Sequence, residues 1–183
     1  ERALEYHTRA LAVVEELGDR LGVASSSVNI GNVYSNLRKY EQALEYYTRG
    51  RTLHEELGNR SGVAIVTGNI GVVFKDLMQY TTALKYYIHA IDLYQELRDR
   101  AGIAIVTGHI GLLYAEKAFS GYNPAKAEEF ILQAISLNKE LGTKEYLYEN
   151  HQALANLYEQ ENRFEEALTH HKKFHEVFQE VQS

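Results

Sequence analysis

Hydrophobic residues recur along the chain at three- and four-residue spacing, which is the period of an α-helix. In residues 20–37 the apolar and small positions share one side of a helix. At 100° per residue, Ser25, Asn29, Asn32 and Asn36 fall together on the opposite side. The pattern therefore predicts a helix with one core-facing side and one polar side.

A second helical pattern follows after a short turn near Arg38. Its inner face carries Ala43 and Tyr47. Small residues at Gly31 and Ala43 let two helix backbones approach each other, and a tyrosine can fill the space around them. The two stretches together predict an antiparallel helical hairpin.

This hairpin pattern returns at forty-residue intervals. SGVAIVTGNIGVVF begins at Ser61, and AGIAIVTGHIGLLY begins forty residues later at Ala101. The third copy has four extra residues in the segment 118–125, where Asn123 can cap a helix and Pro124 can begin it. The sequence predicts one all-α domain over residues 1–183, a right-handed α-solenoid of about nine helices. Its predicted units are one orphan helix, 1–17, and four hairpins, 20–57, 60–97, 100–141 and 144–181.

The hairpins are separated by a recurring turn. Gly18 and Gly58 can take the left-handed conformation after a helix end, and the Asp or Asn that follows can cap the next helix. In the third copy Arg98 replaces the glycine. We therefore expect that turn to be less stable or to have a different geometry.

Composition narrows the functional classes. The chain has no cysteine, which excludes disulfides, thiolate nucleophiles and cysteine-ligated zinc. A net charge of −6 without a basic tract argues against nucleic acid as a partner. No apolar run approaches the roughly 20 residues needed to cross a bilayer. We therefore expect a soluble chain, and the lack of cysteine is compatible with the cytoplasm. Because the chain begins in mid-pattern at Glu1 without an initiator Met, we also expect a fragment of a longer protein.

The repeated positions resemble those of the tetratricopeptide repeat family across essentially the whole chain. In the first full copy the matching residues are Ile30, Gly31, Tyr34, Tyr40, Ala43, Tyr47 and Gly50. The common unit of that family has 34 residues, whereas this unit has 40, and the proline that often closes the second helix is missing at Glu55 and Gln95. Such extended repeats resemble those of kinesin light chains, of spindle-polarity adaptors and of sensor regions in bacterial signalling proteins. The C-terminal stretch EEALTHHKKFHEVFQEVQS is most similar to the last group.

The resemblance implies that the first helix of each hairpin lines a concave groove. The predicted peptide-binding residues are Asn29, Asn32, Asn36, Ile65, Asn69, Val72, Asp76, His109, Leu112, Glu116 and Asn156. They change from amide-rich through apolar to acidic along the chain. Asparagine offers a donor and an acceptor, so a ladder of asparagines can bind the backbone of an extended peptide. The alternative interpretation is that each asparagine is only a soluble surface residue.

Two other patterns have a structural and a functional interpretation. Gly68 and Gly71 lie inside helical patterns without a following Lys-Ser/Thr, so they predict close helix packing rather than a phosphate loop. His171 and His175 are one helical turn apart, a spacing that suits zinc. However, His171 occupies the repeat position of Tyr47, which favours a core residue, and no metal or cofactor is predicted.

The leading interpretation is a non-catalytic scaffold that binds a protein or peptide ligand in its groove. The alternative is a sensory or regulatory region of a larger bacterial signalling enzyme, such as a cyclase, diguanylate cyclase or histidine kinase, acting through ligand capture or dimerisation. A homodimer through the terminal helices is a further possibility, because Phe164, Phe174 and Phe178 form an apolar stripe on the last helix. An unrecognised hydrolase or metalloenzyme is the remaining interpretation.

Overall fold

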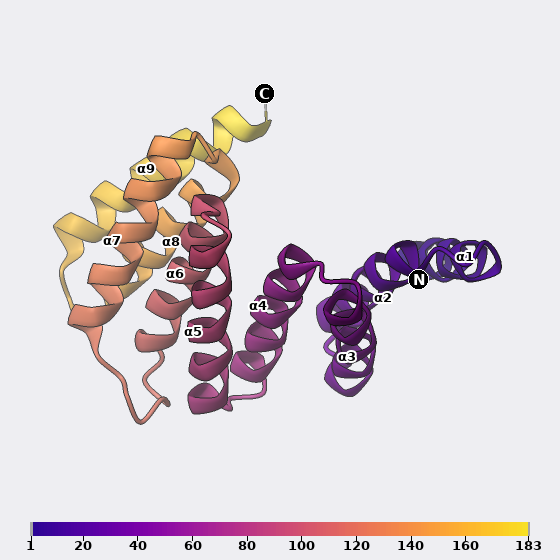
Figure 1. Cartoon of the computed structure of the whole chain (residues 1–183). Helices are drawn as coiled ribbons and strands as arrows, with labels where there is room; N and C mark the ends of the chain where they lie inside the picture. Colours follow the sequence, from indigo (N-terminus) through magenta and orange to yellow (C-terminus); the bar gives the residue numbers. More distant parts are fainter. Residues whose placement is uncertain (1, 183) are drawn as a thin grey trace. The chain divides into compact units, whose positions relative to one another are not determined.

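The computed structural model describes residues 2–182, so Glu1 and Ser183 lie outside the described residues. Over this range the chain forms nine α-helices and no strand (Figure 1). Their bounds are α1 Arg2–Glu16, α2 Arg20–Asn36, α3 Tyr40–Glu56, α4 Arg60–Asp76, α5 Tyr80–Glu96, α6 Arg100–Tyr114, α7 Pro124–Leu141, α8 Lys144–Gln160 and α9 Phe164–Gln182. None of these helices combines the length and apolar character needed to cross a membrane.

The chain divides into two compact units. Helices α1 to α5 belong to the unit Glu1–Leu97, and helices α6 to α9 belong to the unit Arg98–Ser183. The prediction of a single domain over residues 1–183 stays a prediction.

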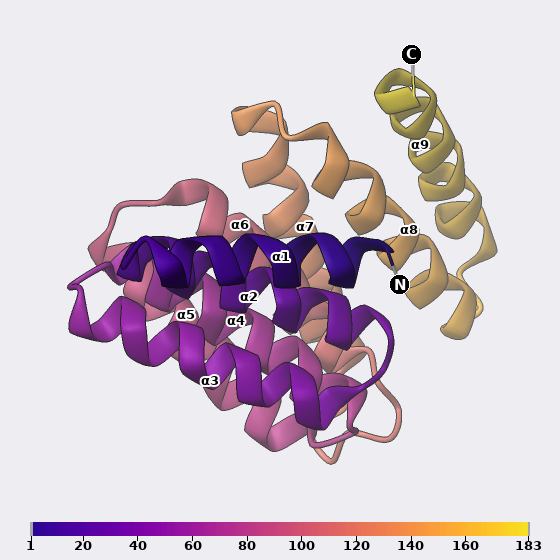
Figure 2. The same cartoon turned by 90° about the vertical axis from the view of Figure 1, so that its right-hand side faces the viewer.

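Within each unit the helices pack as antiparallel pairs. The closest pairs are α2 with α3, α4 with α5, α6 with α7, and α8 with α9. Neighbouring pairs also pack, through α3 with α4 in the first unit and α7 with α8 in the second. Helix α1 lies along α2, on the side away from α3 (Figure 2). Over the described residues, the predicted all-α fold of about nine helices packed as antiparallel hairpins is confirmed.

The pairing depends on close approach between a glycine and a large side chain. A Cβ atom added to Gly31 would lie 2.6 Å from the ring of Tyr47, and one added to Gly71 would lie 2.6 Å from the ring of Tyr87. Both tyrosines are buried. The predicted packing role of these helical glycines is therefore confirmed at both positions.

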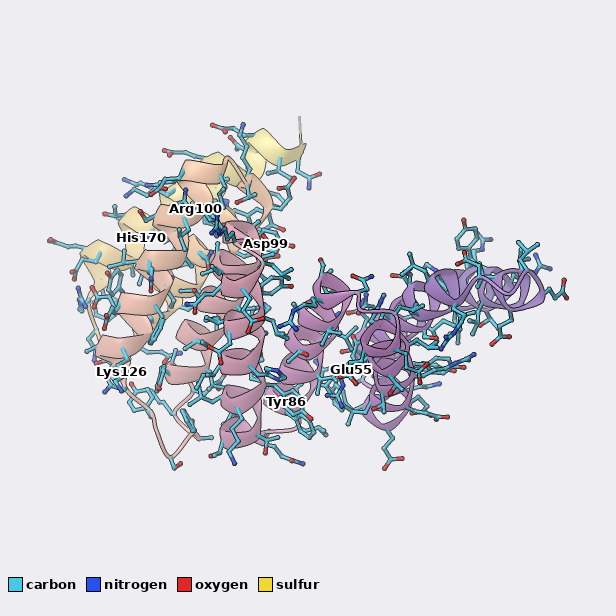
Figure 3. All side chains as sticks on the ribbon, in the orientation of Figure 1. Glu55, Tyr86, Asp99, Arg100, Lys126 and His170 are labelled. Atoms are coloured by element: carbon cyan, nitrogen blue, oxygen red, sulfur yellow. The ribbon has the colours of Figure 1, made fainter. Side chains whose placement is uncertain are left out.

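The helix starts are capped as expected. The side chains of Asp19, Asn59 and Asp99 precede α2, α4 and α6 and accept hydrogen bonds of 2.9–3.0 Å from backbone N–H groups in the first turn (Figure 3 labels Asp99). Such caps satisfy N–H groups that have no partner inside the helix.

Each hairpin also carries an exposed ion pair between the start of its first helix and the end of its second. The pairs are Arg20 with Glu56, Arg60 with Glu96, Arg100 with Glu140, and Lys144 with Glu180. Because all four pairs are exposed, each stabilises the fold by at most about 1 kcal/mol.

The turn at Arg98 keeps the left-handed conformation without a glycine. Arg98 has a φ of 54°, close to the 66° of Gly58 and the 69° of Gly18, so the turn keeps the same left-handed geometry. The helix on each side and the cap that follows hold the backbone in this conformation. An L-residue with a Cβ atom reaches this region at a free-energy cost that glycine avoids.

We therefore expect Arg98→Gly to raise the free energy of unfolding by about 0.5–1 kcal/mol. The reverse change at the matching position, Gly58→Arg, should lower it by a similar amount. Urea denaturation followed by circular dichroism measures both. Equal stability of the two variants and the parent chain would contradict the strain at Arg98.

Candidate functional site

Three hollows lie along α2 and α4 in the unit Glu1–Leu97. We call them the His54 pocket, of about 280 Å³, the Tyr47 hollow, of about 360 Å³, and the Asp76 hollow, of about 370 Å³. All seven residues predicted for this part of the chain line at least one of them: Asn29, Asn32, Asn36, Ile65, Asn69, Val72 and Asp76. The structure thus brings together the polar side of α2 and the side of α4 that carries both apolar and polar residues.

Asn32 lies at the centre of this surface and lines both the His54 pocket and the Tyr47 hollow. Its Oδ1 atom accepts a hydrogen bond of 2.7 Å from the hydroxyl of Tyr47 and one of 3.0 Å from Nδ2 of Asn69. Burial raises the pKa of Tyr47 to about 12, so its hydroxyl keeps its proton at neutral pH. The side-chain oxygen of Asn32 is therefore occupied, and its Nδ2 group is the part left for a ligand.

The sequence pattern predicts Tyr47 only as a core residue of the hairpin. The structure agrees that the side chain is buried, with 2% of the residue exposed, but Tyr47 also lines the Tyr47 hollow, and its hydroxyl group donates to Asn32 there. A buried tyrosine hydroxyl needs a polar partner. The row of asparagines on α2 could have indicated that the Tyr47 hydroxyl group has a polar partner on that helix.

His54 and Asn59 also line the His54 pocket and were missed. His54 occupies a repeat position that holds Val14 in α1, Tyr94 in α5 and Asn138 in α7. Among these four copies, the imidazole is found only in α3. His54 is 4% exposed, and burial lowers its pKa. Nδ2 of Asn59 lies 3.1 Å from Nδ1 of His54. Comparison of the aligned copies would have singled out this position.

In the unit Arg98–Ser183 the predicted residues are only partly brought together. His109 and Leu112 line a small cavity of about 60 Å³, together with Tyr146 and Glu149 of α8. Burial raises the pKa of Glu149. Glu116 lies in the turn after α6, and Asn156 is exposed on α8. A ligand-binding role for these residues stays a prediction.

The histidines of α9 are arranged differently from the expectation. His170 (Figure 3) lies with its Nδ1 atom 2.9 Å from Nδ1 of the buried His151, and its ring also contacts Tyr158. His171, expected in the core, is instead half-buried, with Nε2 2.9 Å from a carboxylate oxygen of Glu159. That prediction is wrong, because an imidazole at the edge of the hairpin keeps a hydrogen bond that the dry core would deny it. Between residues 2 and 182, no three His, Asp or Glu side chains are grouped to hold a metal ion.

The pair of His151 and His170 should make stability depend on pH. Burial lowers the pKa of His151 to about 4, with added effect from the nearby charges of His170, Lys139 and Lys173. Burial also lowers the pKa of His170. Because both values lie below that of an unfolded histidine, the unfolded state binds more protons as the pH falls. Stability is therefore fully present above about pH 6.5 and declines towards about pH 4.

We expect the free energy of unfolding to fall by about 2 kcal/mol between about pH 7 and about pH 5. The variant His151→Leu with His170→Leu should lose most of this dependence, whereas His89→Gln, at an exposed position on α5, should retain it. Chemical denaturation across this pH range measures the effect. An unchanged slope in the double variant would contradict the assignment.

Comparison with known proteins supports the family. A family model described as tetratricopeptide repeat matches residues 1–56, and a second of the same description matches residues 151–174. No curated protein matches the sequence. The two matched stretches agree with the repeat pattern of the hairpins described above, and they support a likeness to tetratricopeptide repeats.

Solved structures show the same fold at low sequence identity. BtubC (BKLC) from P. vanneervenii aligns with a TM-score of 0.75 and 20% identity, over 100% of this chain and 74% of that chain. A Rap protein in complex with competence and sporulation factor has a TM-score of 0.88 and 14% identity, over 98% of this chain and 49% of that one. A putative kinesin light chain from Podospora anserina with nearly identical TPR-like repeats has a TM-score of 0.66 and 12% identity, over 99% and 87%. The chain thus spans about half the length of the Rap protein.

Proposed function

We propose that this chain is a protein-interaction module that captures an extended peptide along α2 and α4. The observation that carries the proposal is the row of three hollows lined by all seven predicted residues of the first unit. Nδ2 of Asn32 and the exposed amide of Asn29 can hydrogen-bond a peptide backbone, whose polar groups are the same for every sequence. Ile65 and Val72 supply apolar contacts beside them.

The lining favours binding over catalysis. It consists mainly of amides, hydroxyl groups and aliphatic side chains, with Asp76 and Arg38 in the Asp76 hollow. A non-catalytic role therefore stays our prediction. The Rap protein solved in complex with competence and sporulation factor supports the proposal, because it shows that a protein with this fold can hold a partner.

The proposal is tested with a displayed library of random short peptides. We expect the chain to select peptides that bind, and we expect Asn29→Arg with Asn69→Arg to weaken their binding at least about tenfold. The larger charged side chains would obstruct the hollows. The matched control is Gln42→Arg with Gln95→Arg, which adds the same charge at exposed positions of α3 and α5 outside the hollows.

Fluorescence anisotropy with labelled peptides gives the affinities, and melting temperatures show that each variant is folded. Failure to select any peptide, or equal binding by both double variants, would overturn the proposal.

A second candidate is a regulatory region of a larger signalling protein that acts through dimerisation. The observation in its favour is the apolar surface of α9, where Phe164 is 64% and Leu168 is 56% exposed. These residues are four apart and share one helix face, where apolar groups gain free energy if a second copy covers them.

If this candidate is right, light scattering at high concentration should give twice the mass of 20.9 kDa. Phe164→Glu with Leu168→Glu should restore the monomer, and Thr169→Glu on the neighbouring face should not. A parent chain that stays monomeric at high concentration would refute dimerisation.

A further inference from the structure

The pair of His151 and His170 joins α8 to α9 at positions where the other hairpins carry groups that do not titrate near neutral pH. In those hairpins the position of His170 holds an aromatic ring that stacks on the first helix: Tyr46 on Tyr34, Tyr86 on Phe74, and Phe130 on Tyr114. The position of His151 holds a buried residue with a hydroxyl group: Ser27, Thr67 or Thr107. The last hairpin therefore differs from the others by having an imidazole at both positions.

Helix α9 is held less extensively than the second helices of the other hairpins. Among the described helices, the backbone of α9 lies close to that of α8 alone (Figure 2). Ala167 is its one buried residue between Phe164 and Gln182, whereas α3, α5 and α7 each bury four or five residues. Segments with little buried surface open at a lower free-energy cost than the whole fold. The two histidines thus lie in the contact whose loss would release α9.

The hydrogen bond between the two rings tolerates one added proton but not two. With both rings neutral, the 2.9 Å contact between the Nδ1 atoms requires that one Nδ1 donates and the other accepts. A first added proton goes to Nε2 of the donor ring and leaves this bond intact. A second must go to the accepting Nδ1, so that two N–H groups and two positive charges face each other. Because His151 is 2% exposed, water cannot compensate while α9 is in place.

The charged groups around the pair do not offset this cost. Four charged side chains of α7 and α9 act on the pair, two of each sign: Lys139, Lys173, Glu128 and Glu166. Both carboxylates are already paired with Arg163. On the α8 side the neighbour is the neutral Tyr158, whose ring contacts His170 and whose hydroxyl group donates to Glu128. Burial is the largest effect, and it lowers the pKa of both histidines.

We propose that the pair of His151 and His170 is a pH-sensitive contact that releases α9 from α8 when both imidazoles take up protons, while the rest of the unit stays folded. Release brings both rings into water, where each binds a proton with its ordinary affinity. Because the pKa of each histidine is lower in the closed state, closure is fully stable above about pH 6.5 and weakens as the pH falls towards about 4.

Release also exposes an aromatic surface. The ring of Tyr148 on α8 makes edge contacts with Phe174 and Phe178 of α9, at centroid distances of 5.9 and 5.5 Å. These three rings are partly covered by one another in the closed state and reach solvent when α9 leaves. The inference concerns the second unit, so it does not depend on peptide capture along α2 and α4.

Hydrogen exchange of the full chain, followed by mass spectrometry and corrected for the intrinsic effect of pH on exchange, tests the inference segment by segment. We expect the protection factors of amides in the middle of α9 to fall at least about twentyfold between about pH 7 and about pH 5. Amides of α6 and α7 should keep their protection. An equal loss across α6 to α9 would mean unfolding of the whole unit, and unchanged protection of α9 would mean no release. Either result would overturn the inference.

The matched variant is His151→Thr with His170→Phe, because the third hairpin carries Thr107 and Phe130 at the same positions. We expect the protection of α9 in this variant to change less than about twofold over the same pH range. His175→Gln, at an exposed position on α9, should retain the full dependence.

A melting curve shows whether each variant folds. If the double variant folds and its α9 loses protection as strongly as that of the parent chain, the assignment to these histidines is wrong. If it does not fold, the parent chain still decides the inference, because its exchange pattern shows whether α9 opens before α6 and α7.

Discussion

The close approach of the two helices in each hairpin is the constraint on which the rest of the molecule depends. At Gly31 and Gly71 the backbone of the first helix is in contact with a buried tyrosine ring of the second, with no room for a Cβ atom. A ring packed against a bare backbone fixes the rotation of the first helix about its axis. Once this rotation is set in α2 and α4, the side that carries Asn29, Asn32 and Asn69 lines the hollows.

Tyr47 connects this packing to the candidate site. Its ring is in contact with Gly31, and its hydroxyl group donates to Asn32. The same side chain therefore supports the hairpin and orients an amide on the surface. Asn69, from the next hairpin, donates to the same oxygen, so the two neighbouring first helices share one hydrogen-bonded centre. A ligand would meet groups that are oriented before it arrives, which reduces the entropy lost on binding.

The sequence predicted the parts of this structure that depend on local periodicity. Helix bounds, the caps at Asp19 and Asn59, and the packing glycines follow from three- and four-residue spacing and from forty-residue repetition. The side of α2 and α4 that forms the hollows was predictable for the same reason. The contacts of His54 with Asn59, and of His170 rather than His171 with His151, were not. They depend on which rotamer satisfies a buried polar atom, and helical periodicity places a residue on a face without choosing its partner. At Arg98 the sequence predicted either a less stable turn or a different geometry, and the structure shows that the left-handed geometry is kept.

Four exposed ion pairs each lie within one hairpin, and they include Arg20 with Glu56 in the first and Arg60 with Glu96 in the second. The same arrangement joins Arg100 to Glu140 and Lys144 to Glu180. Each hairpin therefore contains both residues of one of these ion pairs. Duplicating or removing a whole hairpin would keep both residues of each of these four pairs together, which makes this set of ion pairs compatible with growth and shortening of the array by gene rearrangement.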